Sequence, residues 1–368
     1  MNFQLTEEQR AIADMATSVF ADFCADEQIQ RFWSSDAAYD EDLWQQLRES
    51  GLTALILPED RGGSALGMTE LCAVLESQGR HLAPVPLWSH QLAVAAVARF
   101  AGDAPRGSNG SALADSTQLA TLSLEGLHGG RGLQLHADEA ASGWRLHGRA
   151  VAVPLAAQSA LAVLPVSTAE GARLFAIDLA QSGIEVIEGR LTHHEPAADL
   201  MFTGLPLPAG AALAPEAFGW IAPRVAACFG ALQLGVVEEA LKRVVAYTSG
   251  RVQFGQPIAA FQAISQKCAD CLIDVEALRS SLWQLAWRLD AGLEAAGSAG
   301  VVRAWTCDAG HRVTHAAQHM HGGIGVDISY PIHRYTYWSR AIEIACGGVS
   351  ESLSDLGAWL ATAALEDA

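Results

Sequence analysis

The chain has few basic residues, and this shortage argues against some classes of partner. It carries 23 Lys and Arg against 41 Asp and Glu, a formal net charge of −18 at pH 7. Nucleic acids and anionic membranes are negative themselves, so a chain of this balance is expected to be repelled by both. We therefore expect neither as a partner, and a phosphate-bearing ligand would need a local cluster of donors.

We also expect no segment that directs the chain into or across a membrane. Its first ten residues, MNFQLTEEQR, show no basic leader and no apolar signal core. No apolar run is expected to reach the length of a membrane span, because Arg, Asp or His interrupts the longer ones. These features predict a cytoplasmic protein.

Neither the cysteines nor the histidines show the spacing of a metal site or a disulfide framework. The seven cysteines are an odd number in a chain without a leader, which favours reduced thiols. Cys268 and Cys271 form a CxxC without a second pair, inside an apolar helical pattern, so we interpret them as core or surface thiols. His311, His315 and His319 recur every four residues, but no Cys or Glu pattern accompanies them. We predict packed or interface histidines and no metal.

The N-terminal part of the chain reads as helical up to about residue 105. Thr6 begins a capping box, and a second helix covers roughly residues 41–50. Thr69 is expected to cap a third helix, and residues 87–100 give a fourth. Residues 102–110, rich in Gly, Pro, Ser and Asn, are expected to form a linker.

Two further regions follow. Short β-type runs alternate with turn residues over 112–207, which predicts a small antiparallel, barrel-like domain. Beyond it, long amphipathic runs predict a four-helix bundle; they cover residues 216–248, 257–291, 298–320 and 338–364. The fold class is thus α+β, with predicted domains 1–110, 111–210 and 211–368.

Two motifs in the C-terminal region point to a family. Residues 251–262 read RVQFGQPIAAFQ, and residues 318–325 read QHMHGGIG, with a helix-sized segment between them. The second motif alone is typical of a helix end followed by a turn. As a pair at this separation, they resemble the C-terminal signatures of the acyl-CoA dehydrogenase family, and the resemblance extends over nearly the whole chain, including its helix–sheet–helix order.

The resemblance implies FAD as cofactor, with its ADP half bound by an arm of a neighbouring subunit. On this chain the implied cofactor-binding residues are Arg251, Phe254, Gln262, Gln318, Gly322 and Gly323. It also implies an acyl-CoA substrate that loses hydrogen at its α,β bond, and electron-transfer flavoprotein as the expected electron acceptor.

The same comparison shows no catalytic base in this chain. The family places a glutamate before a Gly-Thr or before an arginine of the first long C-terminal helix. Here these positions read Cys346-Gly347-Gly348 and Pro223-Arg224. A thiol with a pKa of about 8.5 is mostly protonated at neutral pH, so Cys346 is interpreted as a small core residue. We assign no catalytic residue.

The segments expected to touch the flavin ring have also changed. Where the family has Thr-Glu-Pro and Trp-Ile-Thr or Trp-Ile-Ser, this chain reads LSLEGL at 122–127 and AVAVPL at 150–155. The tryptophan and the hydroxyl are gone. The ring pocket therefore looks degraded, whereas the ADP-binding arm looks intact.

This combination resembles the base-less subunit of heterotetrameric bacterial acyl-CoA dehydrogenases of steroid side-chain breakdown, above all in the span 327–335, DISYPIHRY. The main hypothesis is thus a subunit that completes the site of a related catalytic partner. Two alternatives stay open. One is a self-sufficient homo-oligomer with Glu343 or Glu351 as base, and the other is a flavin-free structural paralogue.

Overall fold

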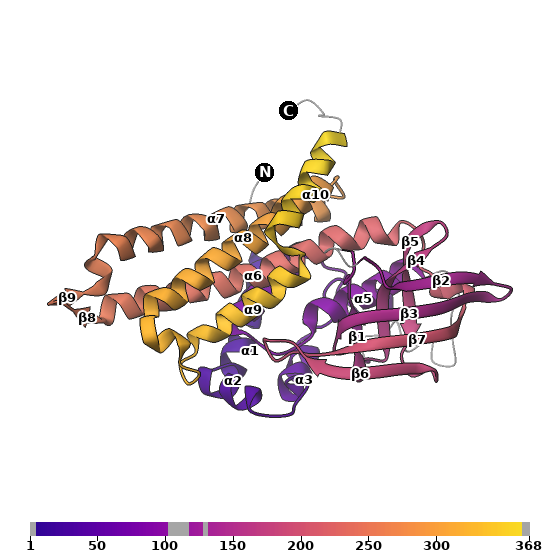
Figure 1. Ribbon diagram of the computed structural model, residues 1–368, viewed down its shortest axis with the longest axis horizontal. Helices are drawn as coiled ribbons and strands as arrows, with labels where there is room; N and C mark the ends of the chain where they lie inside the picture. The colour runs from indigo at the N-terminus through magenta and orange to yellow at the C-terminus, as the bar shows by residue number, and fades with distance from the viewer. Residues whose placement is uncertain (1–4, 102–117, 128–131, 363–368) are drawn as a thin grey trace. The chain divides into compact units, whose positions relative to one another are not determined.

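The computed structural model describes residues 5–101, 118–127 and 132–362, so the predicted linker at 102–110 lies outside the described residues. The helices are α1 (Glu7–Phe23), α2 (Asp26–Trp33), α3 (Glu41–Glu49), α4 (Met68–His81), α5 (Leu87–Phe100), α6 (Ala217–Gly250), α7 (Gln262–Asp290), α8 (Ala296–His321), α9 (Ile332–Ala345) and α10 (Gly348–Thr362). The strands are β1 (Ala120–Leu122), β2 (Leu135–Ala140), β3 (Gly143–Pro154), β4 (Leu161–Thr168), β5 (Gly171–Asp178), β6 (Ile184–Arg190), β7 (Pro196–Pro208), β8 (Val252–Gln253) and β9 (Gln256–Pro257). This helix–sheet–helix order confirms the predicted fold class (Figure 1).

The chain forms two compact units, each built from separate stretches of sequence. The first contains residues 1–31, 68–83 and 226–368, and the second contains 32–67 and 84–225. Helix α6 runs through the boundary, since its first turns belong to the second unit. The predicted division into three domains stays a prediction.

In the first unit, α8 packs between α7 and α9 and also contacts α10 (Figure 1). Helix α4 crosses the middle of α6 at backbone contact. A Cβ on Gly79 would lie 2.0 Å from the Leu232 carbonyl oxygen, and one on Gly235 would lie 1.9 Å from that of Glu76. Only glycine permits so close a crossing, so both positions are fixed by packing.

The start of α4 corrects one prediction. The helix begins at Met68, and Thr69 does not cap it. The carboxylate of Asp290, the last residue of α7, accepts from the backbone N–H groups of Met68 at 2.6 Å and Thr69 at 2.9 Å. Asp290, more than 200 residues later in the sequence, thus caps the N-terminus of α4 in place of a local residue.

The last predicted helix, 338–364, is two helices. Helix α9 begins at Ile332 and ends at Ala345, and α10 begins at Gly348. Gly347 and Gly348 have φ angles of 83° and 81°, which an α-helix does not contain. Five α-helices, α6 to α10, therefore follow the large sheet in the described part of the chain.

The second unit contains a seven-stranded sheet of order β1-β4-β2-β3-β7-β6, with β5 paired to β4. Most neighbours are antiparallel, as predicted, but β1 and β2 each pair with β4 in parallel. Inward-facing side chains such as Leu146, Phe175 and Leu200 form its core. Register shifts in β3 after Leu146 and after Ala150 bend this strand against β7.

Helix α6 corrects the expectation that no apolar run reaches the length of a membrane span. By length and composition α6 could cross a membrane, but 78% of its most apolar window is buried inside the protein. Burial of this kind is typical of the core helix of a bundle.

Candidate functional site

The β8–β9 hairpin forms an exposed arm in a strained conformation. Its two central residues, Phe254 and Gly255, have φ angles of 53° and 82°, the signature of a type I′ turn. Asn or Gly normally holds the first of these positions, and a bulky residue there costs about 1–2 kcal/mol. The Phe254 side chain is nevertheless 93% exposed, with only an edge contact to Phe261 at 6.1 Å between ring centroids. Since neither backbone preference nor burial in this chain explains Phe254, its ring is available to a ligand or a neighbouring chain.

The arm also carries hydrogen-bond donors. The Ile258 N–H donates to the Arg251 carbonyl at 2.9 Å and closes the base of the hairpin. Both the Arg251 and Gln262 side chains are exposed, and no described residue forms a hydrogen bond or ion pair with the Arg251 guanidinium. Gln262 is the first residue of α7, whose N-cap residue Phe261 provides no capping side chain. A free guanidinium beside an open helix N-terminus is the donor set that a phosphate prefers.

The other three predicted cofactor residues lie where α8 ends. Gln318 Oε1 accepts from the Thr336 hydroxyl at 2.8 Å, which leaves its amide N–H groups as donors. Gly322 and Gly323 are exposed, and no atom lies within 4 Å of a Cβ built on either one. Gly322 has a φ of 65°, whereas nothing in the described chain requires glycine at 323.

The structure brings these two groups of residues to the same end of the α7–α8 pair. Cys268, near the start of α7, contacts the sulfur of Met320, near the end of α8, at 3.8 Å. Gln262 is six residues before Cys268, and Gln318 is two residues before Met320. The motifs at 251–262 and 318–325 are thus spatial neighbours, although a 55-residue segment separates them in sequence.

Cys346, at the position where the resemblance places the catalytic glutamate, is buried. Cys346 is 2% exposed and Cys307 is fully buried beside it. A hydrogen bond from the Cys346 thiol to Cys307, together with burial, raises the pKa of Cys346 well above that of a free thiol. Ser352 closes the same cluster, because its hydroxyl donates to the Gly348 carbonyl at 2.7 Å and lies 3.9 Å from the Cys307 sulfur. A protonated, buried thiol cannot serve as a general base at neutral pH.

The second base position holds no carboxylate either. Arg224 stacks its guanidinium on the Trp220 ring, 4.1 Å from the centroid, and donates to the Trp220 carbonyl at 2.8 Å. Of the alternative bases, Glu343 pairs with Arg340 and lies 3.6 Å from His311, so its charge is already matched. Glu351 sits in the first turn of α10 and has interactions of its own.

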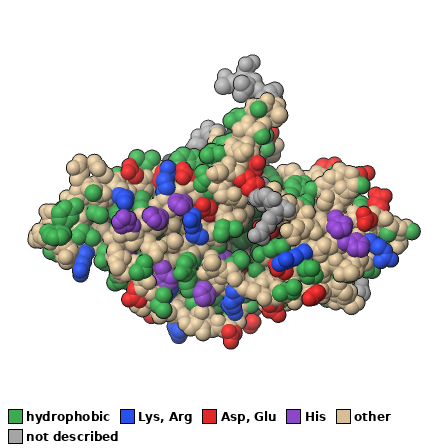
Figure 2. Space-filling view, viewed as in Figure 1, with side chains coloured by type: hydrophobic (Ala, Val, Ile, Leu, Met, Phe, Trp, Pro, Cys, Tyr) green, Lys and Arg blue, Asp and Glu red, His purple; other side chains and the backbone are tan. Residues whose placement is uncertain are grey.

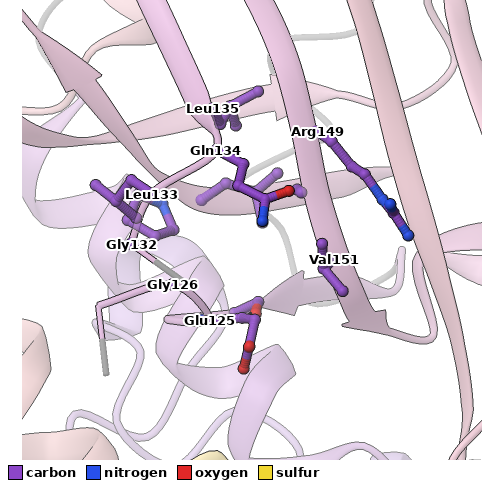
Figure 3. Close-up of a pocket in the computed structure, with 12 residues that line it drawn as sticks. Glu125, Gly126, Gly132, Leu133, Gln134, Leu135, Arg149 and Val151 are labelled. Carbon is purple, nitrogen blue, oxygen red and sulfur yellow. The ribbon is translucent and has the colours of Figure 1, made fainter. Parts of the chain in front are cut away.

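The two segments expected near a flavin ring meet in one open pocket of the second unit (Figure 3). Its volume, including space open to solvent, is about 430 Å³, and Ser123, Glu125, Gly126, Arg149, Ala150 and Val151 belong to its lining. In Figure 3 the Arg149 side chain extends on the other side of strand β3 from Gln134. Arg149 forms an ion pair with Asp199 of β7, so its charge is matched within the sheet. The pocket offers neither an aromatic face nor a hydroxyl at 150–155.

One backbone feature next to this pocket was not predicted. Ala152, with a φ of 50°, lies in the irregular stretch of β3, and the Asp199 carboxylate accepts its N–H at 2.8 Å. A non-glycine residue in this conformation persists only when its surroundings hold it. The lone Asp in an apolar strand was the only available sequence signal.

The histidines of α8 form a row on the surface (Figure 2). The ring centroids of His311 and His315 are 6.1 Å apart, and those of His315 and His319 are 6.5 Å apart. No group of three or more metal-binding side chains occurs among residues 5–101, 118–127 and 132–362. The three side chains are exposed in the chain, and an interface role for them stays a prediction.

Comparison with known proteins is consistent with this geometry. The acyl-CoA dehydrogenase N-terminal domain matches residues 6–108, and the C-terminal domain matches residues 216–358. Acyl-CoA dehydrogenase FadE27 of Mycobacterium tuberculosis is 31% identical over 98% of this chain and 99% of its own length.

This chain belongs to the acyl-CoA dehydrogenase family.

Acyl-CoA dehydrogenases are oxidoreductases that act on the CH–CH group of an acyl-CoA and generally bind FAD. Two solved structures of the family resemble this chain over nearly its full length. The ChsE4–ChsE5 complex from Mycobacterium tuberculosis gives a TM-score of 0.92 at 30% identity, with 99% of this chain and 100% of that chain covered. The Tcur3481–Tcur3483 steroid ACAD G363A variant gives 0.89 at 35% identity, with 96% and 98% covered.

The residues present fit the ADP half of FAD better than its ring. The arm provides an unpaired guanidinium, an exposed amide, an open helix N-terminus and an exposed aromatic face, all suited to a nucleotide pyrophosphate. At residues 150–155, of which Ala150 and Val151 line the pocket, the chain has neither the tryptophan nor the hydroxyl that the resemblance implies for a ring contact. Among the described residues of this acyl-CoA dehydrogenase chain, the donor set thus suits the ADP half of FAD better than the ring.

Proposed function

We propose that this chain is the base-less subunit of a heteromeric, FAD-dependent acyl-CoA dehydrogenase. It contributes Arg251, Phe254, Gln262, Gln318, Gly322 and Gly323 to the ADP half of a flavin held mainly by a related catalytic subunit. The partner provides the glutamate that removes the α-proton of an acyl-CoA. The proposed substrate is a steroid side-chain CoA ester, the proposed electron acceptor is electron-transfer flavoprotein, and the proposed location is the cytoplasm.

The sealed position of Cys346 carries this proposal. A base for α-proton abstraction has to reach the substrate as an anion in a pocket that excludes water. Cys346 is buried against Cys307 and Ser352 with a raised pKa, so it meets neither condition. A chain that has the cofactor arm but no base needs a neighbouring chain that provides the base.

The solved relatives support the partner and the substrate class. One is described as a complex of two differently named proteins, ChsE4 and ChsE5, and the other as a steroid ACAD named for two proteins. Each has a subunit that resembles this chain at 30% identity or more over at least 96% of its residues.

When bound, FAD would accept the hydride that leaves the β-carbon of the acyl-CoA. Arg251 would bind the pyrophosphate through paired, charge-assisted hydrogen bonds, and Gln262 would add its amide N–H groups. The Phe254 ring would cover the adenine or pack on the neighbouring chain. None of these side chains moves a proton of the substrate.

Co-expression tests the proposal directly. The chain is purified alone and together with a related acyl-CoA dehydrogenase chain of the same genome that carries the glutamate before Gly-Thr. We expect little flavin in the single chain and about one FAD per heterodimer, measured by flavin absorbance and by the mass of the complex. A matched complex in which that partner glutamate is replaced by Gln should keep its flavin and lose activity.

Two outcomes would contradict the proposal. Stoichiometric flavin and dehydrogenase activity in the single chain would indicate a self-sufficient enzyme. A colourless chain that associates with none of these partners would indicate a flavin-free structural paralogue.

A further inference from the structure

The segment between α8 and α9 displays three aliphatic side chains to solvent. Ile324, Val326 and Ile328 are 39%, 72% and 81% exposed. Ile324 and Val326 belong to the short 3₁₀ helix Gly322–Val326, and Ile328 follows in the turn before α9. Single exposed aliphatic residues are common, but three at alternate positions of one short loop form a patch.

Hydrogen bonds within the loop hold these side chains in place. Asp327 accepts from the Ser329 N–H at 2.8 Å and from the Ser329 hydroxyl at 2.7 Å, and its own N–H donates to the Ile324 carbonyl at 3.2 Å. Gly325 packs so tightly that a Cβ there would lie 2.5 Å from the Gln318 carbonyl oxygen. The loop thus has a defined conformation in the isolated chain.

Buried and half-buried aromatic side chains anchor the end of the loop. Tyr330 lies 5.3 Å from the His321 ring and 6.5 Å from the Tyr247 ring between centroids, and His321 itself stacks on Tyr247 at 4.5 Å. His321 is 2% exposed and donates from Nδ1 to the Ala317 carbonyl at 2.7 Å. His333 donates from Nδ1 to the Tyr330 carbonyl at 2.7 Å. Both ends of the loop are therefore fixed to the helices of the first unit.

A loop that is rigid, exposed and apolar is suited to dock into a recess of another protein. Its conformation is already set, so binding loses little conformational entropy. An anionic membrane is a poor candidate, because the chain carries a net charge of −18 and the loop itself contains Asp327. The loop starts at Gly322, at the same end of the α7–α8 pair as the arm, so it continues the surface that the proposed function gives to a neighbouring subunit.

We infer that Ile324, Val326 and Ile328 form a docking surface for the glutamate-bearing subunit. This inference rests on the proposed function for the existence of the partner. It adds an apolar contact that is separate from the flavin contacts of Arg251 and Phe254. The partner is expected to offer an uncharged, concave site for the three side chains.

The test is a double variant, Val326→Asp with Ile328→Asp, co-expressed with the glutamate-bearing chain. Both residues are mostly exposed, so the free chain should fold as before, which thermal unfolding checks. Side chains at the centre of an interface each contribute enough that their replacement by a charge should weaken the complex about 100-fold or more. The dissociation constant is measured by sedimentation or mass photometry with excess FAD, so that flavin loss does not limit assembly.

A matched control uses Val186→Asp with Ile187→Asp on β6. These two aliphatic residues are 42% and 50% exposed and belong to the other compact unit. This control should leave the dissociation constant within about threefold of the original value, because surface changes outside an interface have small effects. A further variant, Val326→Ser with Ile328→Ser, should weaken the complex in the same direction without introducing charge.

The outcomes separate this inference from the proposed function. If the loop variant assembles as tightly as the original chain while Arg251→Ala still releases flavin, the docking surface is wrong and the proposed function stands. If the unchanged chain forms no complex with any glutamate-bearing relative, both are wrong. If the chain alone forms a dimer that the loop variant dissolves, the surface binds a second copy and the inference is overturned.

Discussion

The β8–β9 arm and the α9–α10 junction belong to the same compact unit and differ in how their functional groups are used within the chain. At the arm, Phe254 is 93% exposed in a strained turn and Arg251 makes no side-chain interaction with any described residue. At the junction, Cys346 is buried and hydrogen-bonded to Cys307. The arm carries exposed groups that make few contacts within the described chain, whereas the junction carries a buried group that is hydrogen-bonded within it. Exposed groups of this kind can bind a ligand or a partner, whereas a buried, hydrogen-bonded thiol is part of the core.

The largest effect is expected from placing a charge in the buried α9–α10 junction. Cys346→Glu places a carboxylate at the base position, where Cys346, Cys307 and Ser352 are all buried. We expect a loss of about 3 kcal/mol in the free energy of unfolding and no dehydrogenase activity in the single chain.

This variant also has a predicted pH dependence. Burial raises the pKa of the new Glu in the folded state above its unfolded value of about 4.3. The folded state then favours the protonated form, so the loss of stability grows as pH rises. Urea unfolding at pH 5 and pH 8 measures this, with Cys346→Gln as the uncharged control. A stable Cys346→Glu chain that oxidises acyl-CoA alone would show that the base was the only missing element.

The next largest effect is expected from removing the positive charge of Arg251 on the β8–β9 arm. Arg251→Ala should release flavin from the heteromeric complex, because charge-assisted hydrogen bonds contribute about 1.5–3 kcal/mol, a factor of about 10 to 150 in affinity. The urea midpoint of the single chain should stay unchanged. Arg251→Lys should retain an intermediate amount, since an ammonium does not reproduce the paired geometry. Arg61→Ala, an exposed arginine of the turn before α4, is the control. Unchanged flavin content in Arg251→Ala would mean that the arm is not a cofactor site.

A smaller effect is expected from removing the buried thiol of Cys346. Cys346→Ala should lower the activity of the complex by less than about tenfold, whereas loss of a general base typically lowers it about 10²–10⁴-fold. Any loss should follow a decrease of about 1 kcal/mol in stability from the small cavity. Steady-state turnover is measured alongside flavin content. A drop of a hundredfold or more with flavin still bound would make Cys346 part of the chemistry.

The smallest predicted effect is a gain. Phe254→Asn puts a residue that tolerates positive φ into the first central position of the turn, and the single chain should become about 0.5–1 kcal/mol more stable. The same change should weaken flavin retention in the complex. Thermal unfolding of the single chain and flavin content of the complex test the two halves separately. If stability does not rise, Phe254 is not under strain, and if flavin is retained, its ring has no role in binding.

The sequence predicted the elements whose signals are local. Helix Leu87–Phe100 was predicted with its observed bounds, and the capping box at Thr6 is formed by Thr6 and Gln9. It failed where a distant residue decides the structure, as when Asp290 replaces Thr69 as the cap of α4. Strand β7, the longest of the sheet, was not singled out because Pro196, Gly204 and Pro206 interrupt its pattern.

Of the candidate site, the motifs located the positions but not the contacts. The six proposed cofactor residues remain predictions, and the structure shows that they share one end of the α7–α8 pair. No periodicity indicated that Thr336 would bond Gln318, because the two side chains meet across different helices. The buried state of Cys346 could be expected from its residue type, whereas its hydrogen bond to Cys307 required the turn at Gly347 and Gly348.

The bond from Asp290 to the first turn of α4 has a consequence for how the chain is made. Helix α4 leaves the ribosome long before Asp290 is synthesised. Its N-terminus therefore stays uncapped until more than 200 further residues have been added. The backbone crossing of Gly79 with Gly235 imposes a similar wait, because α6 must also arrive first. Contacts this distant in sequence form slowly and leave partly folded chains exposed in the meantime. The first unit can therefore close only late in translation, and nascent chains that stop before α7 are expected to be clients of chaperones.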